Sequence, residues 1–309
     1  MNTSLKSKLL KNKSILALIV LCILISIITP RFLTLANITN VLNQVAVNAI
    51  IAIGMTFVIL TGGIDLSVGS ILAICGAVSA VTIKSTGSIV LAIVLPIIIG
   101  IFVGIINGVV ISKGKIQAFV ATLAVMTIFR GVTYVYTNGN PISSLPDSYN
   151  SIGNKMIGII PLPVIITILV LVIAYYFLTK TRFGRYLYAL GGNEDSARLS
   201  GINTNKIKTA AYVVCGAAAG LSGIIATSRI GSASPNAGTG FELDAIASVV
   251  IGGTSLAGGE GSVIGTIIGA LIIGVLNNGL NLMNVSPFYQ QIVKGAVILL
   301  AVLADKKSK

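Results

Sequence analysis

The sequence contains no histidine and no tryptophan, and only 9% of its 309 residues are charged. Without histidine, Ser-His-Asp triads, imidazole acid–base catalysis and most of the usual metal sites are excluded. The shortage of charge excludes a water-facing surface, because a soluble domain carries about 25% charged residues. A GxxxxGK[ST] phosphate-binding loop is also missing, so ATP, if it is used, must bind to another chain.

Cysteine and acidic residues are scarce as well. The three cysteines, Cys22, Cys75 and Cys215, lie far apart within apolar runs, which favours neither a disulfide framework nor a metal site. The 8 acidic residues stand against 21 Lys and Arg, so the net charge is +13. A basic excess can indicate nucleic-acid binding, but these residues sit in short segments between apolar runs. We therefore interpret them as signals of membrane orientation and expect no nucleic-acid partner.

Hydrophobic residues, in contrast, make up 55% of the sequence. Since about 20 apolar residues span a bilayer, the chain has room for roughly ten spans. We therefore predict an all-α, polytopic transmembrane helical bundle of about ten spans with broken helices. The apolar runs are 14–29, 41–60, 66–83, 88–111, 117–137, 161–179, 209–229, 241–256, 262–282 and 288–304.

Lys and Arg are distributed unevenly over the predicted loops. Ten spans place both termini on one side, and the opposite loops hold only Arg31, Lys84 and Lys155. Because cytoplasmic loops are enriched in Lys and Arg, we predict that both termini are cytoplasmic. Fifteen of the 21 basic residues lie on the terminus-bearing side: Lys6, Lys8, Lys11, Lys13, Lys113, Lys115, Lys180, Arg182, Arg185, Arg198, Lys206, Lys208, Lys306, Lys307 and Lys309.

Two of the ten runs require a choice. The N-terminal lysines and the run 14–29 look like a signal peptide, but no small-x-small cleavage site follows, so we predict a retained first span. The run 241–256 has a clean apolar core, Ala245–Ile251, that covers only ~10 Å as a helix. It is either a re-entrant half-helix or a broken segment that still crosses. The crossing is favoured, because a re-entrant segment would place the C-terminal lysines outside.

Glycine recurs at four-residue spacing in three regions. Small residues on one stripe of a helix allow two backbones to approach closely, which membrane helices need because lipid provides no hydrophobic drive between them. We expect these glycines to serve packing, and they say nothing about a substrate. They are Gly100, Gly104 and Gly108; Gly216 and Gly220; and Gly261, Gly265 and Gly269.

Two other glycine-rich segments resemble each other. Residues 62–70 read GGIDLSVGS and residues 252–262 read GGTSLAGGEGS, and each lies between two apolar runs. Internal duplication with broken helices is typical of transporters, because unwound backbone at membrane depth persists only beside protein or a water-filled path. The alternative is that two glycine-rich turns are alike by chance.

From this similarity we predict one transmembrane domain over 1–309 with a weak internal repeat. The two pseudo-repeats cover approximately 41–179 and 209–304, and a cytoplasmic loop, 180–208, joins them. The break residues that we place near the path through the membrane are Gly62, Gly63, Asp65, Ser67, Gly69, Gly252, Gly253, Gly258 and Gly259.

Few acidic residues lie in or next to the apolar runs, where they could bind an ion, a proton or a substrate. Asp65, in the first break, is either an ion or proton site of the symporter kind or a cap for the free amides of the following helix. We favour the cap. Glu242 and Asp244 open the short run and form a candidate polar site on the outer side. We predict no catalytic, cofactor-binding or metal-binding residue.

The loop 180–208 contains the signals of one short helix. Asn193 is a favourable N-cap, and Glu194 and Asp195 follow in the first turn, where the helix dipole favours acidic residues. Arg198 lies in the last turn, and Gly201 suits the left-handed position beyond it. So short a helix is marginal in water, so we interpret it as a surface that docks on a partner. The alternative is a solvated linker.

At this loop the sequence resembles a known family. The stretches TRFGRYLYALGGNEDSARLSGIN, GTGFELDAIASVVIGGTSLAGGEGSVIGTIIGAL and NNGLNLMNVSPFYQ look like the permease of bacterial ribose ABC importers. The segment GGIDLSVGS is similar to the hallmark of the wider family, which handles ribose, galactose, xylose, arabinose and related compounds. The resemblance runs from Pro30 to the C-terminal lysines.

The resemblance implies a permease that works by alternating access in the bacterial cytoplasmic membrane, as a homodimer surrounded by lipid. It also implies two partners: an extracytoplasmic sugar-binding protein and a cytoplasmic ABC ATPase that holds ATP-Mg, so this chain is not itself an enzyme. Glu260 departs from the pattern, because relatives are expected often to carry a basic residue there, and its role stays open. The matching coupling-helix residues are Asn193, Glu194, Asp195, Ala197, Arg198, Leu199, Ser200 and Gly201.

Two alternatives to a ribose permease remain at this point. The first is a permease for a related sugar such as galactose, xylose or arabinose, because selectivity in this family resides largely in the binding protein. The second alternative is an ion-coupled secondary transporter that acts alone, for which the broken helices and Asp65 would be suited. A membrane-embedded enzyme has little support, since no residue pattern pairs a nucleophile with a base.

Overall fold

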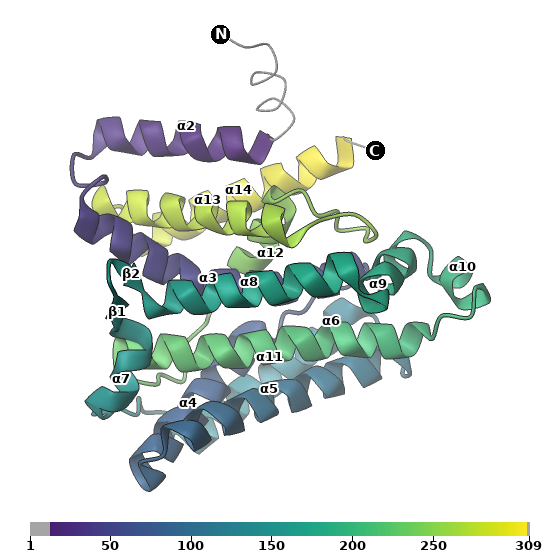
Figure 1. The fold of residues 1–309 in the computed structure, drawn as a ribbon, viewed down its shortest axis with the longest axis horizontal. Helices are drawn as coiled ribbons and strands as arrows, with labels where there is room; N and C mark the ends of the chain where they lie inside the picture. The colour runs from purple at the N-terminus through teal and green to yellow at the C-terminus, as the bar shows by residue number, and fades with distance from the viewer. Residues whose placement is uncertain (1–12, 308–309) are drawn as a thin grey trace.

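The computed structural model describes residues 13–307, and the long helices lie roughly side by side in one bundle (Figure 1). Lys6, Lys8, Lys11 and Lys309, which entered the orientation argument, lie outside the described residues. The helices are α2 (Lys13–Ile28), α3 (Leu35–Leu60), α4 (Val68–Thr86), α5 (Ile89–Ser112), α6 (Ala118–Tyr136), α7 (Asp147–Asn154), α8 (Leu162–Lys180), α9 (Arg182–Gly192), α10 (Glu194–Leu199), α11 (Thr204–Ile230), α12 (Phe241–Ile251), α13 (Val263–Leu282) and α14 (Pro287–Lys307).

Each of the ten predicted apolar runs is helical over most of its length. Seven helices are long and apolar enough to cross a membrane, namely α3, α4, α5, α6, α8, α11 and α13. This confirms an all-α polytopic membrane protein. By comparison α2 has 16 residues and α12 only 11, so the total of ten spans stays a prediction, as does the cytoplasmic location of the termini.

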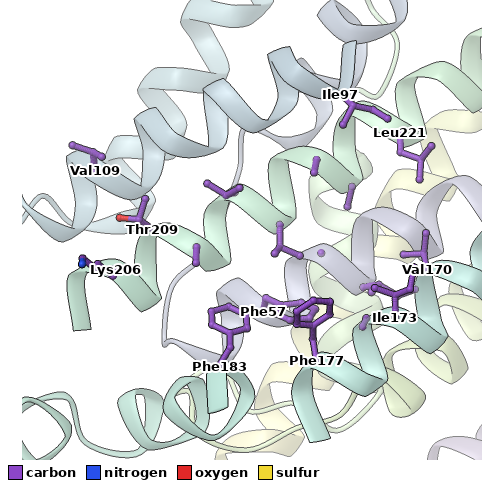
Figure 2. Close-up of a pocket in the computed structure, with 18 of the residues that line it drawn as sticks. Phe57, Ile97, Val109, Val170, Ile173, Phe177, Phe183, Lys206, Thr209 and Leu221 are labelled. Atoms are coloured by element: carbon purple, nitrogen blue, oxygen red, sulfur yellow. The ribbon is translucent and has the colours of Figure 1, made fainter. Parts of the chain in front are cut away.

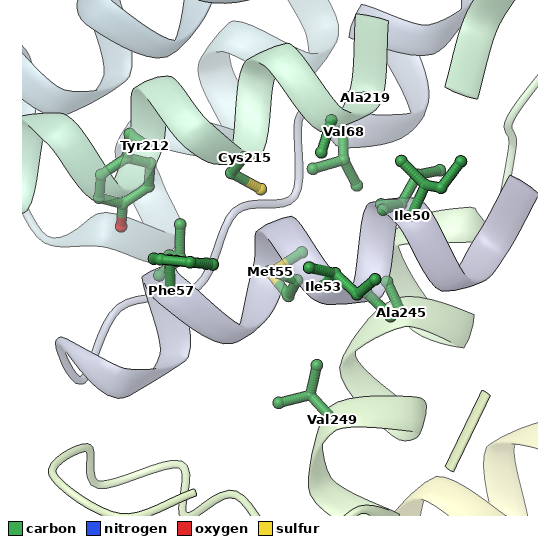
Figure 3. Packing of buried hydrophobic residues seen from close by; sticks show 14 of the residues in the cluster. Ile50, Ile53, Met55, Phe57, Val68, Tyr212, Cys215, Ala219, Ala245 and Val249 are labelled. Carbon is green, nitrogen blue, oxygen red and sulfur yellow. The ribbon is translucent and has the colours of Figure 1, made fainter. Parts of the chain in front are cut away.

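Helix α3 is the central element of the bundle. From Val45 onward nearly every residue is buried, since the helix is apolar on all sides and has neighbours on all sides. Gly54 of α3 packs against α11, since a Cβ there would lie 3.0 Å from Cα of Cys215, and Val249 of α12 lies on the other side of α3 (Figure 3). In contrast, α5, α6 and α8 expose apolar side chains along one side, as expected of helices that face lipid.

The predicted glycine stripes are packing surfaces, except at Gly261, which lies in the second break before α13 and has φ +152°. A Cβ atom on Gly100 would lie 2.3 Å from the carbonyl oxygen of Gly216, and one on Gly104 would lie 2.4 Å from that of Tyr212. Helices α5 and α11 therefore pack backbone against backbone. A Cβ on Gly269 of α13 would lie 1.9 Å from the carbonyl oxygen of Ser248, so α12 and α13 pack in the same way.

Four short elements, two helices and two strands, were not predicted from the sequence. Between α6 and α8 lie α7 and a two-stranded antiparallel hairpin of β1 (Met156–Ile157) and β2 (Ile160–Pro161). The loop 180–208 holds two helices where one was predicted, because α9 precedes α10. Helix α9 forms since its apolar residues Phe183, Leu187 and Leu190 recur at helical spacing and pack on the bundle.

The connecting segments are divided between the two ends of the bundle. Helices α9 and α10 lie at one end, on the right of Figure 1, and α7 with the β-hairpin lies at the other. Helix α2 begins, and α14 ends, toward the end that holds α9 and α10 (Figure 1). This arrangement agrees with an even number of crossings.

Candidate functional site

Helix α10 forms with both of the caps that its sequence predicts. The side chain of Asn193 accepts a hydrogen bond from the backbone N–H of Ser196 at 2.8 Å. At the other end Gly201 adopts φ +83°, and its N–H donates to the carbonyl of Arg198 while that of Ile202 donates to Ala197. This is a Schellman motif, which satisfies carbonyl groups that would otherwise lack partners.

One side of α10 is attached to the bundle, and the other faces outward. Ala197 is buried, and Glu194 pairs with Lys208 of α11 at 2.5 Å and with Arg198 at 3.2 Å. The side chain of Leu199 is 90% exposed. The outward side of α10 is therefore open at Leu199.

The pKa of Glu194 lies below its usual value. Partial burial opposes the charged form, but the hydrogen bond and charge of Lys208 and the charge of Arg198 outweigh that cost. A lowered pKa in the folded state means that the carboxylate stabilises the attachment of α10 above the ordinary pKa of about 4.5, and that this contribution is lost as the pH falls through the lowered value.

We therefore expect a spin label on Leu199→Cys to keep the same mobility from neutral pH down to about 4.5, and to become more mobile below it. In Glu194→Gln the label should be mobile throughout this range. Asp195→Asn is the matched control, because that carboxylate is 88% exposed and lies 3.9 Å from Arg198. Equal mobility in Glu194→Gln and the control would contradict the anchoring role of this pair.

A polar cleft separates α10 from the first helix break. It has a volume of about 690 Å³, and its walls come from α10, from the break, from the α5–α6 turn and from the start of α11. Glu194 and Arg198 line one wall, while Gly62 and Gly63 line another. Two groups of residues that the sequence singled out separately are therefore neighbours in the fold.

The two helix breaks and the end of α9 meet at one point, which we call the glycine junction. It consists of Leu60, Gly62, Gly191, Gly258 and Gly259. The N–H of Gly259 donates to the carbonyl of Leu60 at 3.0 Å. A Cβ on Gly191 would lie 1.9 Å from that carbonyl oxygen and 2.3 Å from the nitrogen of Gly259. At this junction the loop that carries α10 touches both breaks through backbone atoms.

A side-chain contact strengthens this connection between α9 and the second break. The hydroxyl of Tyr188 on α9 donates to the carbonyl of Gly261 at 2.9 Å. At the start of the same break, Gly253 has φ +89°, and a Cβ on Gly252 would lie 2.4 Å from the carbonyl of Gly265. The second break is therefore held between α9 and α13. Glu260 is exposed on it.

Asp65 is fully buried between the first break and α5. Its Oδ1 accepts hydrogen bonds from the backbone N–H and the hydroxyl of Ser67, at 2.9 and 2.6 Å, and the amide of Asn107 lies 3.4 Å away. Because α4 begins at Val68, Asp65 closes the turn before the helix and does not bind the free amides of its first turn. The structure corrects the cap interpretation in this respect.

Helix α12 begins beside the start of α4. A Cβ on Gly69 would lie 2.3 Å from the carbonyl oxygen of Gly238 and 2.7 Å from Oε2 of Glu242. Arg130 of α6 donates to two carbonyls of the segment 235–237, at 2.7 and 2.8 Å, and so holds the chain that leads into α12. Two helix N-termini and a carboxylate meet here, and such broken helices mark substrate sites in transporters.

Asp244 forms an ion pair, whereas none of the ion pairs among the described side chains includes Glu242. Its Oδ2 accepts a hydrogen bond from Nζ of Lys294 on α14 at 3.0 Å, and the Asp244 side chain is only 9% exposed. This ion pair ties the short α12 to α14. The two acidic residues that the sequence placed in one candidate site therefore face different partners, and the location of the site on the outer side stays a prediction.

Removing one partner of a buried ion pair leaves an uncompensated charge, at a cost of roughly 3–5 kcal/mol. We expect Lys294→Met to lower the thermal unfolding temperature of the purified permease strongly, and Asp244→Asn added to it to restore most of the loss. Lys155→Met, at an exposed loop position, is the control. Unchanged unfolding in Lys294→Met would show that the pair contributes no stability.

Four residues that make these contacts were not predicted as site residues, and only two of them carried a signal in the sequence. Arg130 and Lys294 are charged residues inside or beside apolar runs, which marks functional positions in membrane proteins by default. Gly191 and Tyr188 carried no such signal, because their importance comes from contacts with residues about 70 to 130 positions away in the chain.

The long, apolar helices and their breaks define a transport permease, and comparison with known proteins agrees. Residues 37–302 match a family described as the permease component of branched-chain amino acid transport systems. The match covers most of the chain, so the protein belongs to this family and is a multi-pass protein of the cytoplasmic membrane. No solved structure matches the chain.

Relatives that match over nearly the full length carry the names of sugar permeases. The chain is 53% identical to the ribose import permease protein RbsC of Escherichia coli (strain K12), over 98% of this chain and 96% of the relative. It is 56% identical to RbsC of Bacillus subtilis (strain 168), over 94% and 91%. It is 42% identical to the D-allose transport system permease protein AlsC of Escherichia coli (strain K12), over 94% and 90%. These matches confirm the resemblance that the motifs predicted.

Proposed function

We propose that this chain is the membrane-spanning permease subunit of an ATP-driven ABC importer for ribose. The observation that carries the sugar assignment is the identity to relatives, which is 53–56% for those named for ribose and 42% for the one named for allose. The family description mentions branched-chain amino acids, but these relatives are all named for sugars.

The coupling proposal rests on α10. A cytoplasmic ATPase, which holds ATP-Mg, would bind the outward side of this helix around Leu199, and its closure would move α9 and α10 together. The glycine junction would then pass that movement to both helix breaks. At the glycine junction the contacts are made by backbone atoms, so a small displacement of α9 would move both breaks directly.

The topology of the proposed permease depends on which end of the bundle is cytoplasmic. The end of the bundle that holds α9 and α10 is rich in Lys and Arg, including Lys113, Lys115, Lys206 and Lys208, which supports its cytoplasmic placement. Both termini would then be cytoplasmic, with ten spans between them. Two copies would form the central path, and an extracytoplasmic binding protein would deliver the sugar at the end that holds α7.

The substrate assignment is tested with a panel of labelled sugars. The permease is reconstituted with its ATPase and binding protein, and ATP-dependent uptake of ribose, allose, arabinose, galactose and xylose is compared. We expect ribose to be taken up in preference to the other four. Preferential uptake of another sugar by the complete system would reject ribose while leaving the permease assignment intact.

The alternative, an ion-coupled secondary transporter, was suggested by the broken helices, which suit an ABC permease equally, and by Asp65, which is buried. That carboxylate already has three donors from Ser67 and Asn107, so its position is explained by local structure. We therefore propose the ABC importer as the function.

A further inference from the structure

A long apolar groove runs along the outside of the bundle (Figure 2). It has a volume of about 940 Å³ and is lined by residues of α3, α5, α8, α9 and α11, with the short segment before α11. Phe57 and Phe183 stack at one side of it, with ring centroids 6.1 Å apart, and the exposed side chains of Ile173 and Phe177 form a rim on α8. Its lining includes no residue of α6, α12 or α14.

The groove has the length of one lipid leaflet. Along α11 the lining runs from Lys206 to Leu221, and fifteen residues of helix cover ~22 Å. Half of a ~30 Å hydrocarbon core is ~15 Å, so one acyl chain fits with its headgroup beyond the apolar part. A protein surface would need a matching ridge of this length, whereas an acyl chain fills it without one.

All of the charged and amide side chains of the groove lie at one end. Lys113 at the end of α5 and Lys206 at the start of α11 flank it, together with Asn203 and Asn205. Among the side chains that the structure describes, those of 14–300 and 303, no carboxylate lies within 4.0 Å of either ammonium group. This end of the groove lies at the same end of the bundle as α9 and α10. It is where α5 ends and α11 begins.

We propose that this groove binds one anionic phospholipid. An acyl chain lies between α11 and α8, and the phosphate contacts Lys113 and Lys206. Charge complementarity selects the occupant, because two cations without an acidic partner at the membrane surface attract an anionic headgroup. Since the groove touches α3, α9 and α11, the lipid would hold the central helix and the α9–α10 loop in one relative position.

The test measures lipid binding without transport, so its outcome is independent of the proposed function. The purified permease is transferred from vesicles of equimolar phosphatidylglycerol and phosphatidylcholine, and lipids that stay bound are identified by native mass spectrometry. We expect one phosphatidylglycerol per chain in preference to phosphatidylcholine. The double variant Lys113→Gln/Lys206→Gln should lose roughly ten- to thirtyfold of that preference, given about 1 kcal/mol per basic residue.

Two further variants make the result specific. Lys84→Gln/Lys155→Gln removes two charges at the opposite end and should retain the preference. Ala217→Phe fills the apolar groove and leaves both lysines in place, so it should lose bound lipid of either kind at this site. Equal retention of the two lipids by the unaltered permease, or the same preference in Lys113→Gln/Lys206→Gln, would overturn the proposal. Disulfide-linked dimers of Ala217→Cys on oxidation would overturn it too, by assigning the groove to a second copy.

Discussion

Uptake by the Gly201→Pro variant should fall to the background of cells that lack the permease, while the protein still reaches the membrane. Gly201 has φ +83°, whereas proline is fixed near −65°, and the N–H that proline lacks is the donor to the carbonyl of Arg198. The C-terminal cap of α10 cannot form in this variant. Transport of labelled sugar and the amount of permease in isolated membranes are measured together.

The matched control is Gly87→Pro. Gly87 is also a left-handed glycine that ends a helix, with φ +66° and an N–H that donates to the carbonyl of Ile83, but it ends α4 at the opposite end of the bundle. It should keep substantial uptake. A two-residue insertion after Ser200, which shifts α10 without proline, should abolish uptake as Gly201→Pro does. Normal uptake in both α10 variants would show that α10 does not couple the cycle.

Gly191→Ala should likewise abolish ATP-dependent uptake, although it adds a single methyl group. That methyl carbon would lie 1.9 Å from the carbonyl oxygen of Leu60 and 2.3 Å from the nitrogen of Gly259. Backbone atoms cannot yield as a flexible side chain does, so α9 must separate from both breaks. Uptake and sugar-stimulated ATP hydrolysis are measured in the reconstituted complex, and we expect hydrolysis to continue without transport.

The neighbouring residue provides the control. A Cβ on Gly192 would have no atom within 4 Å outside its own neighbours, so Gly192→Ala changes helix propensity and little else. It should transport at nearly the normal rate. If Gly191→Ala and Gly192→Ala behave alike, the glycine junction has no special role, and coupling must pass through other contacts.

Local features of this fold could be predicted from the sequence because their causes are local. The apolar runs predicted the long helices, since lipid demands continuous apolar surface and internal hydrogen bonding. The helix α10 was predicted from Asn193 and Gly201, whose cap roles depend on residues within the same short segment. The glycine stripes predicted close packing for the same kind of reason.

Other features depend on which distant segments meet, and one sequence does not contain that information. The glycine junction joins residues near 60, 191 and 259, and the pair of Asp244 with Lys294 joins α12 to α14. Helix α9 was missed because it is amphipathic, so its mean hydropathy is that of a loop. Its apolar face is buried only because it packs on the end of the bundle. The role of Asp65 was only half predicted, since its partner Asn107 comes from α5.

The central claim is that this chain forms a path and that a separate ATPase drives it through α10. The most direct measurement compares sugar accumulation in proteoliposomes that hold the permease alone, under a proton or sodium gradient, with accumulation in those that also hold the ATPase, the binding protein and ATP. We predict accumulation only in the complete system, and none there with Gly201→Pro. Accumulation by the permease alone under an ion gradient would contradict the account.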